Sequence, residues 1–167
     1  MSVNLRRVAC TPEQIFVVLA DPWVYPTWVV GASRMRAADT GWPEPGTKLH
    51  HSIGVWPFVL NDETRVDTWD APHRVVLEAK TRPVGRERVI IEVEPQGHGC
   101  LVRIEEYVLS GPLLLIPQRL LDVVFHIRNA ETLRRLAHVA KGRAAEARAA
   151  MGRAVEGRAA EGRAVAS

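Results

Sequence analysis

The sequence of 167 residues contains only two cysteines, Cys10 and Cys100, and no Cys-x-x-Cys pair. A disulfide framework and a zinc ribbon are excluded, because both need several cysteines at short, regular spacings. A low cysteine count is typical of a reduced, cytoplasmic protein, in which disulfides are rare. We therefore expect a cytoplasmic protein with two free thiols.

Long apolar runs are absent as well. The longest, 113–116, stops at Pro117, far short of the 18 or more residues of a membrane-spanning helix. The first 14 residues, MSVNLRRVACTPEQ, contain neither the apolar segment nor the small-residue cleavage site of a secretory signal. We expect no stable insertion into a membrane.

The net charge of the sequence is also small. Lys and Arg number 22 against 19 Asp and Glu, a net charge of +3. Residues 143–167 hold five Arg and three Glu, so that segment carries +2 and the preceding residues only +1. Binding to nucleic acid needs clustered excess cations that neutralise phosphates. We therefore expect no nucleic-acid partner.

The sequence also lacks the common catalytic signatures Gly-x-Ser-x-Gly, His-Glu-x-x-His and Gly-x-x-x-x-Gly-Lys. Gly97-His98-Gly99 begins like a dinucleotide fingerprint but has no third glycine, and it lies between two expected strands, so we interpret it as a hairpin turn. His50 and His51 cannot chelate together in a strand, because adjacent side chains point to opposite faces. No metal or cofactor is expected.

The first 30 residues predict one strand and two short helices. Alternating apolar residues indicate a strand over 2–10. Thr11 followed by Pro12 and Gln14 is a capping box with proline at the first helical position, and the helix should end at Asp21-Pro22. Residues 23–30, WVYPTWVV, are too interrupted by proline for a long helix and predict a short helical turn packed on apolar groups.

From residue 32 to 110, short alternating segments separated by Gly and Pro turns predict six strands, over 33–38, 47–56, 58–69, 74–82, 86–94 and 100–109. One apolar and one polar face indicate an antiparallel sheet, half-buried on one side. A helix should then run from Pro117 to about Lys141. Together these elements predict an α+β fold with a seven-stranded antiparallel sheet.

The last residues form a five-residue repeat: GRAAE, ARAAM, GRAVE, GRAAE, GRAVA. A period of five distributes Arg and Val around the helix, so no apolar stripe forms. Glycine begins four of the five units, and each costs about 1 kcal/mol of helix propensity. We expect residues 142–167 to be a frayed helix or a disordered extension whose removal leaves stability unchanged.

The ordered set of elements resembles the START-like (SRPBCC) superfamily, which includes polyketide cyclases, plant pathogenesis-related allergens and lipid-transfer domains. The stretches that carry the resemblance are TPEQIFVVLADPWVYPTWVVGA (11–32), WPEPGT (42–47), VDTWDAPHRVVLEA (66–79), EEYVLSGP (105–112) and RNAETLRRLA (128–137). They are most similar to the actinobacterial polyketide cyclase/dehydrase group, over residues 1–141. The resemblance implies a helix-grip fold, a curved sheet around the long helix, with an apolar cavity between them.

Two candidate catalytic residues follow from periodicity. Glu106 shares its strand face with Val102 and Ile104, so it should face the concave side, where burial would raise its pKa and suit it to proton transfer. Alternatively, the strand twists outward and leaves Glu106 in water. His126 falls on the helical face of Leu133, unless the first turns of that helix protrude into solvent.

Further residues are candidates for contact with a ligand. His51 shares the strand face of Leu49 and Ile53, although a histidine satisfied by the backbone is the alternative. We expect Trp28 at the cavity mouth, where the resemblance places the closing short helix. The expected cavity is lined by Trp28, Leu49, His51, Ile53, Ile91, Ile104, Phe125, Asn129 and Leu133.

The leading functional hypothesis is binding of a hydrophobic or aromatic small molecule, polyketide-like or lipid-like, in that cavity. The enzyme version is a polyketide cyclase/aromatase or dehydratase in which Glu106 or a histidine moves a proton. A non-catalytic carrier or sensor is the second alternative, and a protein-interaction module is the third. A monomer or a homodimer is expected.

Overall fold

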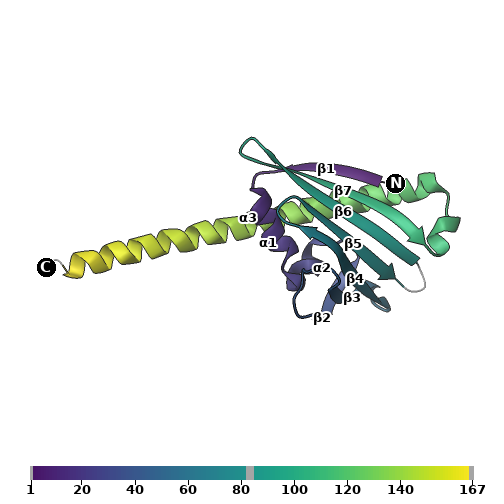
Figure 1. Cartoon of the computed structure of the whole chain (residues 1–167), viewed down its shortest axis with the longest axis horizontal. Helices are drawn as coiled ribbons and strands as arrows, with labels where there is room; N and C mark the ends of the chain where they lie inside the picture. Colours follow the sequence, from purple (N-terminus) through teal and green to yellow (C-terminus); the bar gives the residue numbers. More distant parts are fainter. Residues whose placement is uncertain (1, 82–84, 166–167) are drawn as a thin grey trace.

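The computed structural model of the chain describes residues 2–81 and 85–165 (Figure 1). Its elements, in order, are β1 (Ser2–Val8), α1 (Pro12–Leu19), the 3-10 helix η1 (Pro22–Val24), α2 (Tyr25–Trp28), β2 (Ala32–Ala38), β3 (Lys48–Val55), β4 (Phe58–Asp70), β5 (Arg74–Thr81), β6 (Gly85–Gln96), β7 (Gly99–Ser110), η2 (Pro112–Leu115) and α3 (Gln118–Val165). The predicted order of strands and helices is therefore present.

The start of α1 is fixed by the predicted capping box. The Thr11 hydroxyl accepts from the Gln14 amide at 3.4 Å, and the Gln14 side chain accepts from the Thr11 amide at 3.0 Å. Two N–H groups that the helix itself cannot satisfy are thereby paired. Asp21 then caps η1 through the Trp23 amide, so the chain turns directly into α2.

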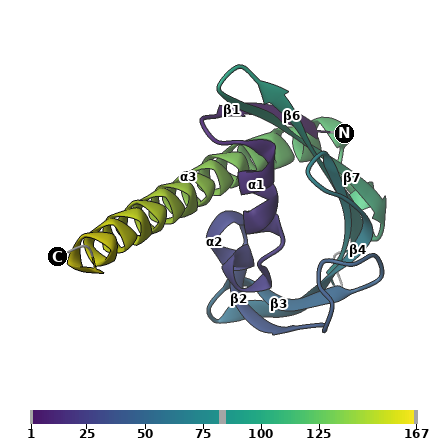
Figure 2. The ribbon, with the colours of Figure 1, turned by 60° about the vertical axis from the view of Figure 1, so that its left-hand side comes forward.

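The seven strands form one antiparallel sheet in the order β1-β7-β6-β5-β4-β3-β2. Figure 2 shows the sheet curling into a C whose open side is covered by α1, α2 and α3. The architecture is the helix-grip fold that the sequence predicted. Because the strands curve, side chains from β3 to β7 converge on a single hollow under the helices.

The tight β3–β4 hairpin depends on Gly54. Its φ is +99°, in the region that favours glycine, and a Cβ there would lie 2.2 Å from the Phe58 carbonyl oxygen. Any other residue would clash with this backbone and strain the turn. The hairpin sets the register in which His51 of β3 lies opposite Asp62 of β4.

Helix α3 turns one face toward the sheet. Its buried side chains include Phe125, Asn129, Leu133, Leu136 and Ala140, which repeat at the three- and four-residue spacings of an amphipathic helix. They join a core built from the concave faces of the strands, where Leu49 and Ile91 have no exposed surface. The helix therefore forms the roof of the hollow.

Beyond this core, α3 continues to Val165 and projects from the body of the protein (Figure 1). The sequence analysis expected this helix to end near Lys141; that prediction was wrong, because the helix continues to Val165. Ala144 is buried, and Arg143 forms an ion pair with Asp21, so the first turn of the repeat packs against the body. Residues 145–154 are exposed. The division into a domain of residues 1–141 and a separate tail of residues 142–167 remains a prediction.

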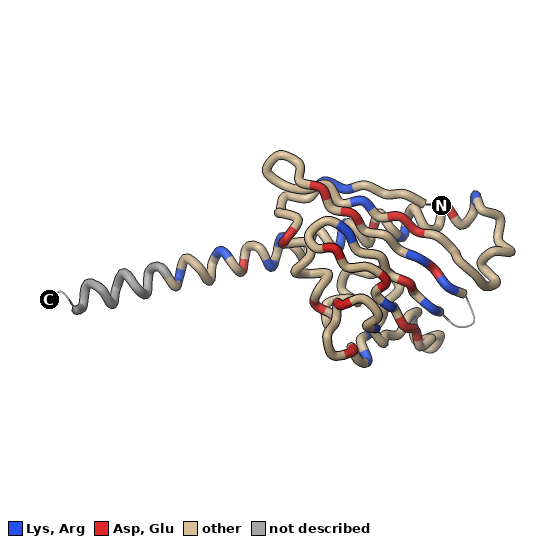
Figure 3. Tube along the Cα trace, viewed as in Figure 1, with Lys and Arg blue, Asp and Glu red and all other residues tan. Residues whose placement is uncertain are grey.

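Charges of both signs alternate along the strands (Figure 3). Several are paired across neighbouring strands, such as Arg103 of β7 with Glu92 of β6 at 2.8 Å. Pairing of this kind lowers the local excess of positive or negative charge on the surface of the sheet. That no nucleic acid binds to this surface remains a prediction.

Candidate functional site

A cavity of about 170 Å³ lies between the sheet and the helices. Its walls come from α2 and the loop after it, from β3 to β7, and from α3. The lining residues are Tyr25, Trp28, Val29, Val30, Gly31, Ala32, His51, Ile53, Asp62, Thr64, Leu77, Ala79, Glu87, Val89, Ile91, Ile104, Arg128, Asn129 and Thr132. Most of these are apolar, and the polar ones form two groups.

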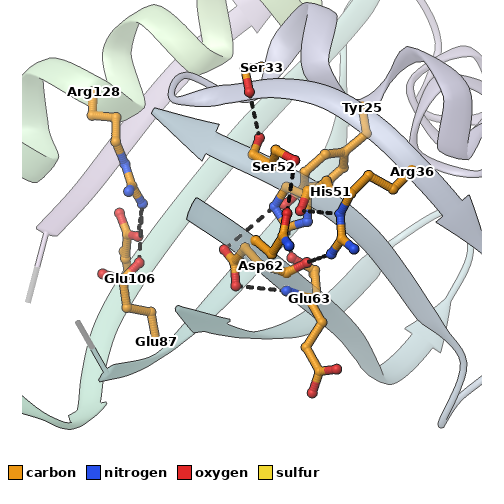
Figure 4. Close-up of polar contacts among 12 residues, drawn as sticks. Tyr25, Ser33, Arg36, His51, Ser52, Asp62, Glu63, Glu87, Glu106 and Arg128 are labelled. Carbon is orange, nitrogen blue, oxygen red and sulfur yellow. Dashed lines mark hydrogen bonds and ion pairs between the residues drawn. The ribbon is translucent and has the colours of Figure 1, made fainter. Parts of the chain in front are cut away.

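The first polar group joins α3 to β6 and β7 (Figure 4). Arg128 contacts the Glu106 carboxylate directly, and its Nη2 lies 3.5 Å from an oxygen of Glu87. Asn129 donates from Nδ2 to the second Glu106 oxygen at 3.0 Å. The Glu106 side chain has no exposed surface, so it depends on these two partners to offset its desolvation.

The pKa of Glu87, in this group, is raised well above its ordinary value. Burial raises the pKa of Glu87 to about 7; Arg128 partly offsets the rise, and Glu106 adds to it. One guanidinium therefore faces two carboxyl groups, and Glu87 is partly protonated near neutral pH. A protonated carboxyl can donate a hydrogen bond into the cavity, which an ionised one cannot.

The second polar group lies on β3 and β4 beneath α2 (Figure 4). His51 Nε2 is 3.6 Å from Asp62 Oδ2, and both side chains are almost fully buried. Asp62 also accepts from the Glu63 amide at 2.7 Å. Burial lowers the pKa of His51, although Asp62 opposes the change. The imidazole is therefore neutral at pH 7, and the nearby Asp62 carboxylate favours the tautomer with hydrogen on Nε2.

Tyr25 packs between two other cavity residues. Its ring lies edge-on to His51 at 4.9 Å and to Trp28 at 5.3 Å between centroids. Its hydroxyl shares a hydrogen bond of 3.1 Å with Thr64, and burial raises the pKa of Tyr25 to about 12. The hydroxyl consequently stays protonated at neutral pH.

Two buried polar atoms beside Tyr25 lack a hydrogen-bond partner among the described residues. They are Nδ1 of His51 and Nε1 of Trp28. In the neutral His51 tautomer, Nδ1 is an acceptor, while the indole N–H is a donor only. Leaving such groups unpaired costs about 1–3 kcal/mol each, so a cavity occupant with matching groups would recover part of that cost.

Six of the nine residues expected in the cavity lining are found there: Trp28, His51, Ile53, Ile91, Ile104 and Asn129. Leu49, Phe125 and Leu133 are not. They are buried in packing contacts with other side chains, since residues on the concave face reach the cavity only where the helices do not cover them. Phe125 instead supports the Arg128 guanidinium, which lies 5.2 Å from its ring centroid.

Of the two candidate catalytic residues, Glu106 faces inward, as strand parity predicted, and contacts Asn129. His126 does not share this site; its side chain is exposed beside a surface depression lined by Ser2, Val3 and Ile127. At this end α3 passes over the edge strand β1, and Asn4 donates to the His126 carbonyl oxygen at 3.0 Å. His126 therefore lies before the part of α3 that covers the cavity. Catalysis by Glu106 or His126 remains a prediction.

Sequence reasoning missed Glu87, Arg128 and Asp62. For two of them a signal was available: Glu87 continues the inward face of Val89 and Ile91, and Asp62 continues that of Thr64 and Val66 on β4. Arg128 had no such signal, because it lies about 100° from Asn129 around the helix. Its long side chain reaches sideways to the carboxylates.

Within the described part of the chain, no group of three or more His, Cys, Asp or Glu residues could hold a metal ion. No described helix combines the length and apolarity that crossing a membrane requires. Cys10 and Cys100 are both buried and are not joined in a disulfide.

The sequence matches no family model. It is 30% identical over 114 residues to uncharacterized proteins of Mycobacterium bovis and Mycobacterium tuberculosis. Each match covers 65% of this chain and 66% of the relative, just under two thirds of its length.

Three solved structures illustrate the likeness in fold. A structural-genomics protein of Nitrosomonas europaea has a TM-score of 0.67 at 17% identity and covers 86% of this chain and 95% of its own. The di-domain ARO/CYC StfQ from the steffimycin biosynthetic pathway has a TM-score of 0.67 at 12% identity, over 86% of this chain and 51% of its own. The protein Ara h 8.0201 has a TM-score of 0.62 at 9% identity, over 84% and 96%. These likenesses show that the chain shares the helix-grip fold of these structures.

Proposed function

We propose that this protein binds a small, neutral, largely apolar molecule, with one or two aromatic rings, in the cavity beneath α3. The observation that carries the proposal is the cavity itself, whose walls are mostly apolar and whose few polar groups converge at two places. Ligand sites commonly combine an apolar lining with a small number of oriented polar groups. That a solved structure of this fold comes from a biosynthetic pathway supports the choice of a small molecule.

The volume limits the size of the ligand. An engineered cavity of about 150 Å³ holds benzene, and drug-sized ligands occupy roughly 300–1,000 Å³. At about 170 Å³, the cavity suits a one-ring molecule, or a two-ring molecule if the side chains around it adjust. A multi-ring polyketide or a long acyl chain would need the cavity to enlarge.

Catalysis is the second candidate function, and Glu87 is the observation that favours it. A carboxyl group in the cavity wall with a pKa of about 7 can both give and take a proton at neutral pH. Such a group would suit cyclisation or dehydration, the reactions that the sequence resemblance implied. A carrier would use the same group only as a hydrogen-bond donor.

Isothermal titration with 2-naphthol tests the binding proposal. The matched variants are Ala79→Phe, which fills the cavity from β5, and Ala130→Phe, which places the same ring on an exposed position of α3. We expect micromolar to millimolar binding by the native protein and by Ala130→Phe, and none by Ala79→Phe. Equal binding by all three proteins would contradict the proposal, because the ligand would then lie outside the cavity.

A further inference from the structure

We infer that the ligand of this cavity is bipolar, with a carbonyl-type acceptor at one end and a hydroxyl at the other. This inference rests on the proposed function and assigns the chemical class of the ligand. It follows from the different hydrogen-bonding characters of the two polar groups and from their separation on the sheet.

The end of the cavity near α3 presents donors. Arg128 has five N–H donors and Asn129 has two, and neither side chain spends all of them on Glu106. Arg128 is the one cation in the lining, and it already faces the carboxyl groups of Glu106 and Glu87. An anionic ligand would meet the oxygens of these two carboxyl groups, whereas a neutral ketone or aldehyde oxygen accepts from the remaining N–H donors with less repulsion.

The end beneath α2 presents an acceptor. The Asp62 carboxylate, 3.6 Å from Nε2 of His51, favours the tautomer with hydrogen on that nitrogen, and Nδ1 has no hydrogen-bond partner among the described residues. A hydroxyl group on the ligand is a neutral group that can donate to this nitrogen and can also accept from the unpaired indole N–H of Trp28.

The separation of the two ends matches a ring that carries substituents on opposite sides. His51 lies on β3 and Glu87 on β6, with β4 and β5 between them. Three strand spacings amount to about 14 Å along the sheet, and the curvature shortens the direct path across the hollow. Apolar residues, among them Leu77, Val89 and Ile104, occupy the wall between the ends and would contact the ring.

The test compares the affinities of five probes of similar size: 4′-hydroxyacetophenone, acetophenone, 4-ethylphenol, ethylbenzene and 4-hydroxybenzoate. Each polar group should improve the dissociation constant about fivefold over ethylbenzene, the gain of one net hydrogen bond. At pH 6.5, where the benzoate carboxylate is ionised and the phenol of the hydroxyketone is not, the hydroxyketone should bind most tightly and 4-hydroxybenzoate more weakly than it.

His51→Phe supplies the protein side of the test, with His50→Phe as its matched control. His50 is the adjacent residue, faces the other side of the strand and lies 3.5 Å from Asp39. We expect His51→Phe to abolish the preference for hydroxyl-bearing probes and to keep the preference for the ketone. His50→Phe should keep both preferences.

The outcomes separate this inference from the proposed function. If ethylbenzene binds as tightly as the hydroxyketone, or if His51→Phe keeps the hydroxyl preference, the bipolar assignment is wrong while the cavity still binds ligands. If no probe binds to the folded native protein, the proposed function fails as well. Should His51→Phe not fold, as judged by circular dichroism, the probe series with the native protein decides alone.

Discussion

Replacing Glu87 with glutamine should stabilise the protein, and increasingly so as the pH rises. Burial raises the pKa of Glu87 from 4.5 to about 7. The folded state therefore binds this proton more tightly than the unfolded state does, and stability falls as the pH rises from about 4.5 through 7. The rise in the Glu87 pKa from 4.5 to about 7 corresponds to a loss of roughly 3 kcal/mol in the free energy of unfolding, which is complete above pH 7. Glutamine has no charge to desolvate and escapes this loss.

The assay is urea denaturation of the native protein and Glu87→Gln at pH 5 and pH 8.5. The variant should gain about 2–3 kcal/mol relative to the native protein between these pH values. Glu94→Gln, an exposed position on the same strand, is the matched control and should show no such gain. A stability difference for Glu87→Gln that is equal at both pH values would refute the reasoning, because Glu87 would then titrate alike in the folded and unfolded states.

Arg128→Met should cost about 3–5 kcal/mol, since it leaves the buried Glu106 carboxylate without its cation; the double variant with Glu106→Leu should recover most of this loss in urea denaturation. Deleting residues 148–167 should leave the melting temperature unchanged, whereas deleting 143–167 should lower it, because the latter also removes the turn of α3 that packs on the body; equal melting temperatures would contradict that packing. The two thiols, both buried, should react with a disulfide reagent only after denaturation, and both should then be found; fast reaction in the folded state would contradict their burial.

Strand parity predicted much of the site, because it depends only on the two-residue period of a β-strand. It placed Glu106 with Val102 and Ile104 on the concave face, and the same rule applied to β6 would have placed Glu87 there. Parity alone could not show that Glu87 and Glu106 face one cation. That contact depends on the register between β6 and β7 and on the position of α3 above them.

Helical periodicity was less reliable, since the depth of burial changes along α3. Asn129 and Leu133 lie on the predicted face. His126 lies near that face on an ideal helical wheel, but there the helix still lies over the edge strand β1 and has not yet reached the cavity. The wheel describes one helix and carries no information about where the sheet beneath it ends.

The repeat at the end of the chain shows a similar limit. Its five-residue period predicts that no apolar stripe forms, and residues 145–154 are exposed. The buried Ala144 and the ion pair of Arg143 with Asp21 were not predictable, because they depend on where α1 ends relative to α3. Local periodicity does not predict such contacts between distant segments.

The most direct test of the central claim is a nitrogen–proton correlation spectrum of the tryptophan indoles during titration with 2-naphthol. Trp28 lines the cavity and its indole N–H has no partner among the described residues, whereas Trp23 and Trp56 are 64% and 85% exposed. With the Trp28 signal assigned through Trp28→Phe, that signal should shift and saturate with the ligand while the signals of Trp23 and Trp56 stay in place. A titration that shifts Trp23 or Trp56 and leaves Trp28 unmoved would contradict the account, since the ligand would then bind to the surface and not in the cavity.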